Sequence, residues 1–268
     1  MADETTAFRG SVPENYDRYL GPMLFAPYAR DLVQRIPQRD DVSVLELACG
    51  TGIVTARLRA YLPESTRLCA TDLNEGMLNF AKAKHSAPGI EWQVADMMAL
   101  PFADGSFDYV LCQFGMMFLP DKTGAMREAR RVLKDDGRFL FNVWDSLDAN
   151  DLSRVAHETI VSFFPSDPPR FYETPFGSYD VNAMRGYLAA AGFRDVQLTP
   201  VEFECVSPSA HDAAAGLVQG TPVVVAVKDR DRSAIPKLTD AVAHALAREF
   251  GEEPCRGRMC ALVWEATR

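Results

Sequence analysis

The sequence predicts an α/β protein built on a doubly wound, Rossmann-like sheet of seven mostly parallel strands with an antiparallel edge strand. The first observation is that short apolar runs alternate with helical patterns from Asp40 onward, which is typical of βαβ units. The second is a length of 268 residues with 47% hydrophobic residues, enough for one such domain with additions. We therefore expect one domain over residues 1–268, divided into an N-terminal helical cap (1–39), a core (40–145), a lid insertion (146–180) and a C-terminal part of the sheet with a helical insertion (181–268).

The expected cap is rich in aromatic residues and proline, which predicts short helices interrupted by prolines. Tyr16 and Tyr19 lie three residues apart in it, and on a helix that spacing places both side chains on one side. The two tyrosines are therefore candidates for the wall of a ligand pocket. Simple packing is the alternative interpretation.

The core contains five apolar runs that predict strands. They are Val42–Ala48, Thr66–Thr71, Ile90–Ala95, Phe107–Phe114 and Arg138–Trp144. The helices expected between them are Ile53–Leu62, Glu75–Lys84 and Thr123–Leu133. Asn74 precedes the second helix and is a good N-cap, because its side chain accepts a hydrogen bond from a free N–H of the first turn.

The chain after the core alternates between irregular and regular segments. Ser146–Asp180 is dense in phenylalanine and proline, which suggests an insertion that covers an active site. The elements expected after it are a helix at Val181–Ala191, a strand at Val196–Cys205, a helix at Ile235–Phe250 and a strand at Met259–Ala266. The two late strands predict the antiparallel edge of the sheet.

The charge balance argues against a nucleic-acid partner. The 28 Lys+Arg and 37 Asp+Glu residues give a net charge of −9, which repels a phosphate backbone. A basic group does exist, and it comprises Arg127, Arg130, Arg131 and Lys134. We interpret it as a solvated helix face, with a local binding patch as the alternative.

Two other classes are also disfavoured. The longest aliphatic stretch, Val223–Val227, is far shorter than the roughly 20 residues of a membrane span. The acidic N-terminus lacks the apolar region of a secretory signal, so we expect a cytoplasmic protein. Six cysteines occur without a Cys-x-x-Cys pair, and we expect neither a metal site nor disulfides.

The most informative segment runs from Val44 to Gly52, where a buried strand leads into a glycine-containing turn and then a helix. Glycines allow the backbone to approach a ligand, and the helix N-terminus offers free N–H groups. Such a turn predicts a nucleotide-like ligand at the carboxyl ends of the strands. Asp72 stands 20 positions after Gly52, at the end of the second strand, where it would accept hydrogen bonds from both ribose hydroxyls.

Two kinds of cofactor compete for this site. Dinucleotide binders carry a third small residue in the turn motif, but Thr55 occupies that position here. Asp96 follows the third strand, where a carboxylate would accept a hydrogen bond from an adenine amino group. Asp72 and Asp96 together favour a mononucleoside with a short amino-acid tail. The alternative is that the segment is an ordinary tight turn and that the two aspartates only cap strand ends, without binding a ligand.

Five ordered segments carry a resemblance to a known family. They are Glu46–Gly52, Ala70–Asn74, Ala95–Asp96 followed by Leu100–Phe102, Ser106–Val110, and Arg131–Lys134 with Gly137. Over residues 40–145 the chain resembles class I S-adenosylmethionine-dependent methyltransferases, and in particular the small-molecule enzymes similar to the ubiquinone/menaquinone biosynthesis methyltransferases. The resemblance implies S-adenosyl-L-methionine as cofactor, S-adenosyl-L-homocysteine as product, and a small, apolar or aromatic metabolite as methyl acceptor.

The resemblance also implies which residues bind the cofactor. They are Ala48, Cys49, Gly50, Thr51, Gly52, Asp72, Leu73, Met77, Ala95, Asp96, Met97, Cys112 and Gln113. The turn at 48–52 would hold the methionine moiety and Asp72 the ribose. Leu73 and Met77 would enclose the adenine from one side, while Asp96 and the backbone of the next residue would read its edge.

A second set of residues is expected around the methyl acceptor. It comprises Tyr16, Tyr19, Phe114, Met117 and Trp144. The resemblance places the Cys112 carbonyl against the methionine ammonium and gives Glu46 a structural role beneath the turn. No catalytic residue is predicted, because positioning supplies much of the acceleration of a methyl transfer. A general base, if one acts, is sought at His157 or His211, which flank the variable regions.

Three functions remain open from the sequence. The first is a methyltransferase acting on a small molecule, as a monomer or homodimer. The second is an NAD(P)-dependent oxidoreductase on the same sheet architecture. The third is a non-catalytic sensor that binds S-adenosylmethionine and signals to a partner.

Overall fold

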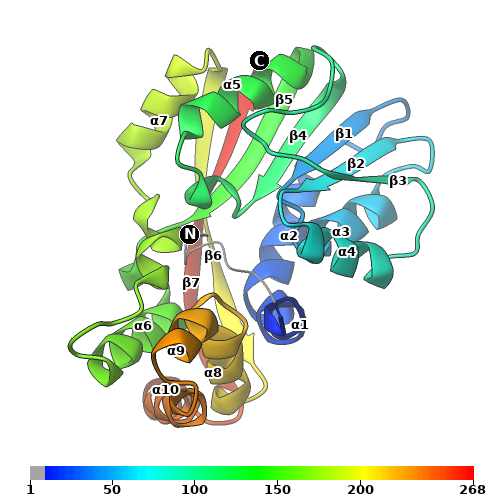
Figure 1. Ribbon diagram of the computed structural model, residues 1–268. Helices are drawn as coiled ribbons and strands as arrows, with labels where there is room; N and C mark the ends of the chain where they lie inside the picture. Colours follow the sequence, from blue (N-terminus) through cyan, green and yellow to red (C-terminus); the bar gives the residue numbers. More distant parts are fainter. Residues whose placement is uncertain (1–9) are drawn as a thin grey trace. The chain divides into compact units, whose positions relative to one another are not determined.

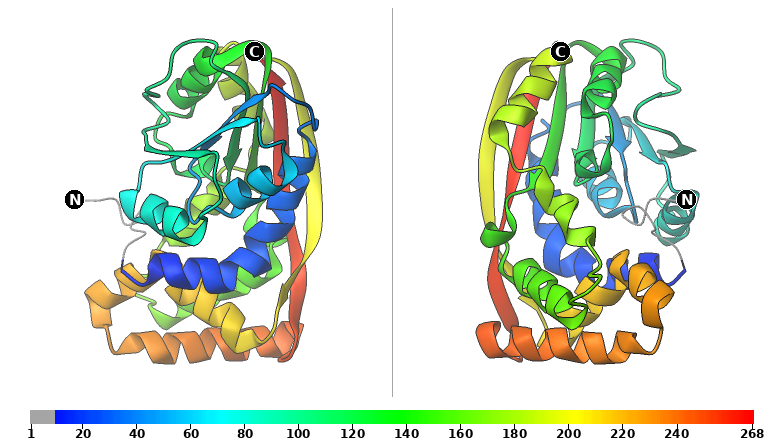
Figure 2. Two further views of the ribbon diagram at one scale, coloured as in Figure 1. Left: turned by 90° about the vertical axis from the view of Figure 1, so that its right-hand side faces the viewer. Right: turned by 60° about the vertical axis from the view of Figure 1, so that its left-hand side comes forward.

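The computed structural model describes residues 10–268, and the first nine residues of the expected cap lie outside the described part. The described chain forms two compact units (Figures 1 and 2). The first unit contains the described residues up to Pro27 together with Asp145–Gly177 and Glu202–Cys260. The second contains Tyr28–Trp144, Ser178–Val201 and Ala261–Arg268. The division into cap, core, lid and C-terminal part stays a prediction, because compactness does not distinguish an elaborated single domain from two domains.

A seven-stranded sheet forms the centre of the second unit, and two of its strands, β6 and β7, also run into segments of the first. The strands are β1 Ser43–Leu47, β2 Arg67–Asp72, β3 Ile90–Val94, β4 Phe107–Gln113, β5 Leu133–Trp144, β6 Arg194–Ser207 and β7 Cys255–Thr267. Their order is β3-β2-β1-β4-β5-β7-β6 (Figure 1). The first five strands pair in parallel, and β7 pairs antiparallel with β5. The predicted mostly parallel, Rossmann-like sheet with a late antiparallel strand is therefore confirmed.

The helices of the second unit are α2 Ala26–Gln34, which starts in the first unit, α3 Ile53–Tyr61, α4 Glu75–Lys84, α5 Lys122–Val132 and α7 Val181–Ala190. Leu32 of α2 and Leu58 of α3 join Val44 and other sheet residues in one buried apolar cluster. Strand residues between these point to the other face, where Phe139 stacks on Phe141 and on Phe193. Both faces of the sheet are thus covered, as a parallel sheet requires.

Short polar side chains begin several of these helices where the sequence predicts. Asn74 accepts a hydrogen bond from the N–H of Met77, which confirms it as the N-cap of α4. Asp121 does the same for α5 through Gly124. Most predicted helix and strand bounds agree with the structure within two residues. The exceptions are β5, which begins at Leu133 directly after α5, and β7, which begins at Cys255 and not at Met259.

The first unit is mainly helical. Its helices are α1 Val12–Asn15, the π-helix η2 Tyr16–Phe25, α6 Asp151–Phe163, α8 Ala210–Gln219, α9 Val223–Asp231 and α10 Ala234–Phe250. Helix α10 packs against α6 and α8 (Figure 1). The segment expected to be an irregular lid therefore contains a helix of 13 residues, and only its second half, with two 3₁₀ turns at Phe171–Glu173 and Pro175–Gly177, is irregular.

Prolines do not interrupt the N-terminal helices as the sequence led us to expect. The backbone stays helical from Val12 to Gln34, and Pro22 lies inside the π-helix. A π-helix bonds each N–H to the carbonyl five residues back, as Ala26 does to Gly21, and this wider spacing accommodates a residue that lacks an N–H. Among residues 10–268, no helix is both long and apolar enough to cross a membrane.

Candidate functional site: the carboxyl ends of β1 to β5

The turn after β1 departs from ordinary backbone geometry at three residues. Ala48, Gly50 and Gly52 have φ values of +53°, +56° and +79°. Glycine suits this positive φ at position 52, and a Cβ there would lie 2.7 Å from Cδ2 of His85, so a larger residue would also displace that ring. The N–H of Cys49 donates to the carbonyl of Thr71 at 2.9 Å, which ties the turn to β2. Of the three, Ala48 alone carries a Cβ and is therefore strained at its positive φ, and strained residues cluster at functional sites.

Asp72 connects the turn to the end of β2. Its Oδ2 accepts from the N–H of Gly50 and its Oδ1 from the N–H of Asn74, each at 2.8 Å. Burial raises the pKa of Asp72 above its ordinary value, and the two N–H donors partly offset this effect. Because each carboxylate oxygen has two lone pairs, Asp72 keeps acceptor sites for two hydroxyl groups.

The residues beside Asp72 suit a flat apolar ligand. Leu73 is 67% exposed although it directly follows a strand. Met77 is buried, and its Cε would lie 3.6 Å from a Cβ built on Gly50. An exposed leucine next to a buried methionine and the turn offers an apolar surface for an adenine ring.

Asp96 lies just beyond β3 and is joined to the same strand ends. The N–H of Ala95 donates to the carbonyl of Asp72 at 3.1 Å, which brings the two carboxylate residues to neighbouring positions. One oxygen of Asp96 accepts from the N–H of Met98 at 2.8 Å, which leaves acceptor capacity on the carboxylate.

A clamp from α5 holds the loop that follows Asp96. Arg131 donates to the carbonyls of Leu100 and Phe102, and Glu128 accepts from the N–H of Leu100 at 2.8 Å. Glu128 and Arg131 are also paired with each other. Arg130 donates to the carbonyl of Gly192, and Lys134 pairs with Asp108. Three members of the basic group on the sequence are therefore engaged within the protein.

The end of β4 lies directly beside the end of β1. Cys112 is in register with Leu47. Gly115 follows the strand, and a Cβ on it would lie 2.7 Å from both Cβ of Ala48 and Sγ of Cys112. A larger residue would therefore force the two strand ends apart. Sequence reasoning missed Gly115, because an isolated glycine carries no motif.

Four apolar side chains meet near the ends of β4 and β5. The rings of Phe114 and Trp144 stack with centroids 4.0 Å apart, and Tyr28 meets both edge-on at 5.5 and 5.4 Å. Met117 accepts from the N–H of Trp144 through its sulfur. The structure thus brings together the predicted acceptor residues Phe114, Met117 and Trp144. It adds Tyr28, another aromatic residue from the range expected to form the cap.

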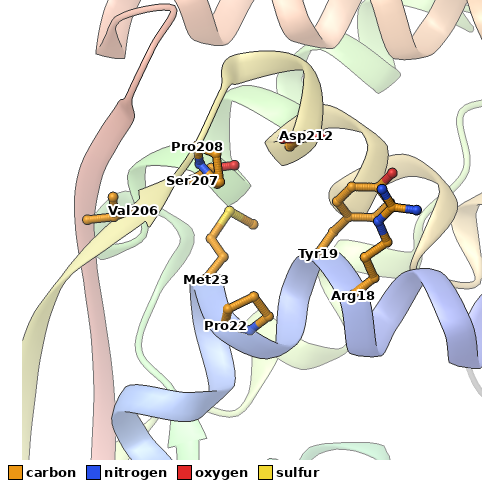
Figure 3. Close-up of a pocket in the computed structure, with 8 residues that line it drawn as sticks. All are labelled: Arg18, Tyr19, Pro22, Met23, Val206, Ser207, Pro208 and Asp212. Carbon is orange, nitrogen blue, oxygen red and sulfur yellow. The ribbon is translucent and has the colours of Figure 1, made fainter.

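Tyr16 and Tyr19 have different surroundings in the structure, and their place in an acceptor pocket stays a prediction. Tyr16 stacks on Phe25 at 4.6 Å, whereas Tyr19 lines a groove of about 440 Å³ in the first unit (Figure 3). The groove is formed by Arg18, Tyr19, Pro22, Met23, Val206, Ser207, Pro208 and Asp212. The expectation that both tyrosines share one side assumed α-helical spacing. In the observed π-helix, residues three apart lie further round the axis.

Beneath the turn, Thr55 and Glu46 form a buried pair. The Thr55 hydroxyl donates to Oε2 of Glu46 at 2.5 Å, and the two residues are 0% and 2% exposed. Burial raises the pKa of Glu46 to about 8. The structural role expected for Glu46 agrees with this position. Its partner is Thr55, the residue at which the turn departs from the dinucleotide motif.

The remaining chemistry-bearing residues form no second centre. All six cysteines are free and buried, and residues 10–268 contain no group of three or more potential metal ligands. His211 is exposed. His157 is half-buried in the first unit, its Nδ1 has no hydrogen-bond partner there, and burial lowers its pKa. A role for either histidine as a base stays a prediction.

These features define a class of protein. Positive-φ residues after β1, a carboxylate with spare acceptor sites after β2, and a second carboxylate after β3 converge at one edge of a Rossmann-like sheet. Their donor and acceptor groups fit an adenosine cofactor without a pyrophosphate site.

Comparisons with known proteins identify the family. Residues 45–141 match the model of a methyltransferase domain. Ubiquinone/menaquinone biosynthesis C-methyltransferase of Klebsiella pneumoniae is 40% identical over 190 residues, which cover 66% of this chain and 71% of that protein. Malonyl-[acyl-carrier protein] O-methyltransferase of Hahella chejuensis is 42% identical over 97 residues, which cover 36% of this chain and 34% of that protein. The chain thus spans about a third of the length of this second relative.

Solved structures agree on the fold. Phosphoethanolamine N-methyltransferase 2 of Haemonchus contortus, in complex with S-adenosyl-L-methionine, has a TM-score of 0.63 at 14% identity and covers 98% of this chain and 58% of its own. A methyltransferase structure from Bacillus halodurans has a TM-score of 0.57 at 19% identity, and the match covers 89% of this chain and 97% of that chain. The chain belongs to the class I S-adenosylmethionine-dependent methyltransferases. This family membership excludes the alternative function of a nicotinamide-dependent oxidoreductase.

Proposed function

We propose that this methyltransferase acts on a small, apolar or aromatic metabolite. The observation that carries the proposal is the cluster of Tyr28, Phe114, Met117 and Trp144 near the ends of β4 and β5. A charged acceptor would lose hydration beside these side chains without gaining a partner, whereas an apolar or aromatic acceptor would gain contact area. The quinone-related name of the Klebsiella relative supports the same class of acceptor.

We propose that the cofactor is held by groups spread over four strand ends. The turn 48–52 binds the methionine moiety, and Asp72 accepts hydrogen bonds from the ribose. Leu73 and Met77 contact the adenine, and Asp96 and Met97 read its edge. The carbonyl of Cys112 accepts a hydrogen bond from the ammonium group, with Gln113 beside it. Met77 lies in the first turn of α4, and the other residues lie at or just after the ends of β1, β2, β3 and β4.

The mechanism needs positioning more than a covalent residue. When bound, S-adenosylmethionine supplies a methyl group on a sulfonium, which a nucleophile attacks in line. The strand-end residues fix one reactant, and the aromatic cluster orients the other and excludes water. Neither role requires a covalent residue. An acceptor that reacts through a hydroxyl or an activated carbon must also release a proton, and a base would help that step.

We also propose that the enzyme acts in the cytoplasm as a monomer or homodimer, without a nucleic-acid partner. Arg130, Arg131 and Lys134 each have a hydrogen-bond or ion-pair partner within the protein, which supports the last point because contact with phosphates would have to replace those partners. Sedimentation velocity measures the oligomeric state, and a gel-shift series with tRNA and duplex DNA at low salt should show no complex.

The experiment that tests the acceptor class uses radiolabelled S-adenosylmethionine and fractions of a metabolite extract. Labelled product should appear in the organic-extractable fractions with the natural protein and be lost with Asp72→Ala. Label that appears only in polar, charged fractions would overturn the proposed acceptor class. Calorimetric binding of S-adenosylhomocysteine without transfer to any fraction would favour the non-catalytic sensor instead.

A further inference from the structure

Asn142 is a fully buried polar residue in an otherwise apolar part of β5. It is 0% exposed, and it lies between Phe141 and Val143, in register with Gln113 on β4 and Val263 on β7. A buried amide costs free energy unless its groups are hydrogen-bonded. An amide at this position therefore calls for a physical explanation.

The oxygen of the Asn142 side chain supports a strained residue. Oδ1 accepts from the N–H of Phe114 at 3.0 Å, and the main-chain carbonyl of Asn142 accepts from the same N–H at 3.2 Å. Phe114 has φ +55°, a left-handed conformation that is costly for a residue with a Cβ. The second acceptor helps to hold Phe114 in this conformation, which turns the chain sharply after β4.

The nitrogen of the same side chain is left unused. Nδ2 is buried and has no hydrogen-bond partner among residues 10–268. It is bonded to the same carbon as Oδ1, so it also lies beside the turn at Phe114. Nearly all buried polar groups in folded proteins have a partner. A free donor here suggests that the local hydrogen bonding is completed when a ligand or an accompanying water occupies the site.

We propose that Asn142 is a positioning residue for the amino-acid end of the cofactor. It fixes the Phe114 turn and, through it, the Cys112–Gln113 backbone that binds the methionine ammonium; this step rests on the proposed mode of cofactor binding. Asp72 and Asp96 hold the adenosine end independently of that turn, because they lie after β2 and β3. The two ends of the cofactor are therefore separable by mutation.

The test compares two ligands that share an adenosine and differ in the amino-acid tail. S-adenosylhomocysteine carries the tail, and 5′-methylthioadenosine lacks it. Leucine is similar in size to asparagine and has no polar group. Asn142→Leu should therefore lower the affinity for S-adenosylhomocysteine, measured by calorimetry, about tenfold or more, equivalent to about 1.4 kcal/mol. The same variant should bind 5′-methylthioadenosine within about twofold of the natural protein, which is within 0.5 kcal/mol on the same scale.

A second buried asparagine provides the control. Asn150 is 3% exposed, and its side-chain Nδ2 donates hydrogen bonds to the carbonyls of Asp145, Ser146 and Cys260 in the first unit. Asn150→Leu should lower the unfolding temperature without changing the ratio of the two affinities. Asn142→Ala replaces Asn142→Leu if the latter does not fold, and the ratio should change in the same direction.

The outcomes separate the two proposals. If the natural protein binds neither ligand, the proposed cofactor mode fails. If it binds both and Asn142→Leu weakens them equally, or weakens neither, the positioning role fails while the cofactor mode stands. A higher KM for S-adenosylmethionine with an unchanged kcat at saturation would support positioning, and a purely structural defect would not produce that split.

Discussion

The hydroxyl of Thr55 on α3 donates a hydrogen bond of 2.5 Å to the buried carboxyl of Glu46 on β1. This bond joins the strand to the first turn of the helix and so spans the turn to which the methionine moiety is proposed to bind. The hydrogen bond between these two side chains therefore stabilises the strand–turn–helix segment in addition to its backbone hydrogen bonds.

Removing this donor should destabilise the protein. Thr55→Val keeps the size of the side chain and leaves the Glu46 carboxyl without its partner, which typically costs about 1–3 kcal/mol. Urea unfolding followed by circular dichroism measures the change. Thr55→Ser retains the hydroxyl and should lose less than half as much; equal losses in both variants would mean that packing of the methyl group, and not the hydrogen bond, matters.

Glu46 should make stability decrease as the pH rises. Its pKa is raised to about 8 in the folded protein, so the folded state binds more protons than the unfolded state between about pH 4.5 and pH 8. The free energy of unfolding falls through that window. Glu46→Gln should flatten the dependence of the unfolding temperature on pH there, whereas exposed Glu64→Gln should not. A wild-type slope in Glu46→Gln would contradict the raised pKa.

Asp72 should dominate the affinity for the ribose. Hydrogen bonds to a charged acceptor are worth about 1.5–3 kcal/mol, so Asp72→Asn should weaken S-adenosylhomocysteine about 10- to 100-fold. Calorimetry on folded protein provides the measurement, with exposed Asp240→Asn as the matched control. Affinities that agree within error for the two variants would remove Asp72 from the site.

Gly115 should not tolerate a side chain. An added Cβ would lie 2.7 Å from Ala48 and from Cys112. Gly115→Ala should therefore lower the free energy of unfolding by about 1–3 kcal/mol through overpacking, and it should also lower the affinity for the cofactor. Gly186→Ala, on an exposed part of α7 with no atom within 4 Å of the new Cβ, should instead gain about 0.4–1 kcal/mol. Thermal unfolding of the two variants should move in opposite directions; the same direction in both would argue against the close approach.

The sequence was sufficient for the parts of the molecule in which local chemistry and periodicity agree. Asn74 is an example, because a capping side chain before an amphipathic run specifies the start of a helix whatever lies around it. The alternation of apolar runs and helices likewise predicted the order of strands and helices in the core. Motif spacing placed Asp72 and Asp96 after consecutive strands, where the structure shows them.

Other features depend on contacts between distant residues and left no local signal. Ala48 and Phe114 adopt left-handed conformations although neither is glycine, since the surrounding chain imposes them. Asn142 is a single amide in an apolar run, and its meaning appears only beside Phe114. Pro22 misled the sequence interpretation, because proline is read as a helix breaker unless a π-helix accommodates it. Helix α6 was not predicted, because the aromatic and proline residues that follow it led to one interpretation for the whole segment.

The exposed side chain of Leu73 would link the amount of folded protein to the supply of its cofactor. In the proposed binding mode the adenine covers this apolar group, which is two-thirds exposed in the free protein, and ligand binding then becomes part of the thermodynamics of folding. A ligand that binds only the folded state stabilises it by mass action, by about 2.7 kcal/mol at a hundredfold excess over Kd. Cells depleted of S-adenosylmethionine would then hold this enzyme in a less stable form, which proteases remove more readily, so its abundance would follow the methyl-donor supply.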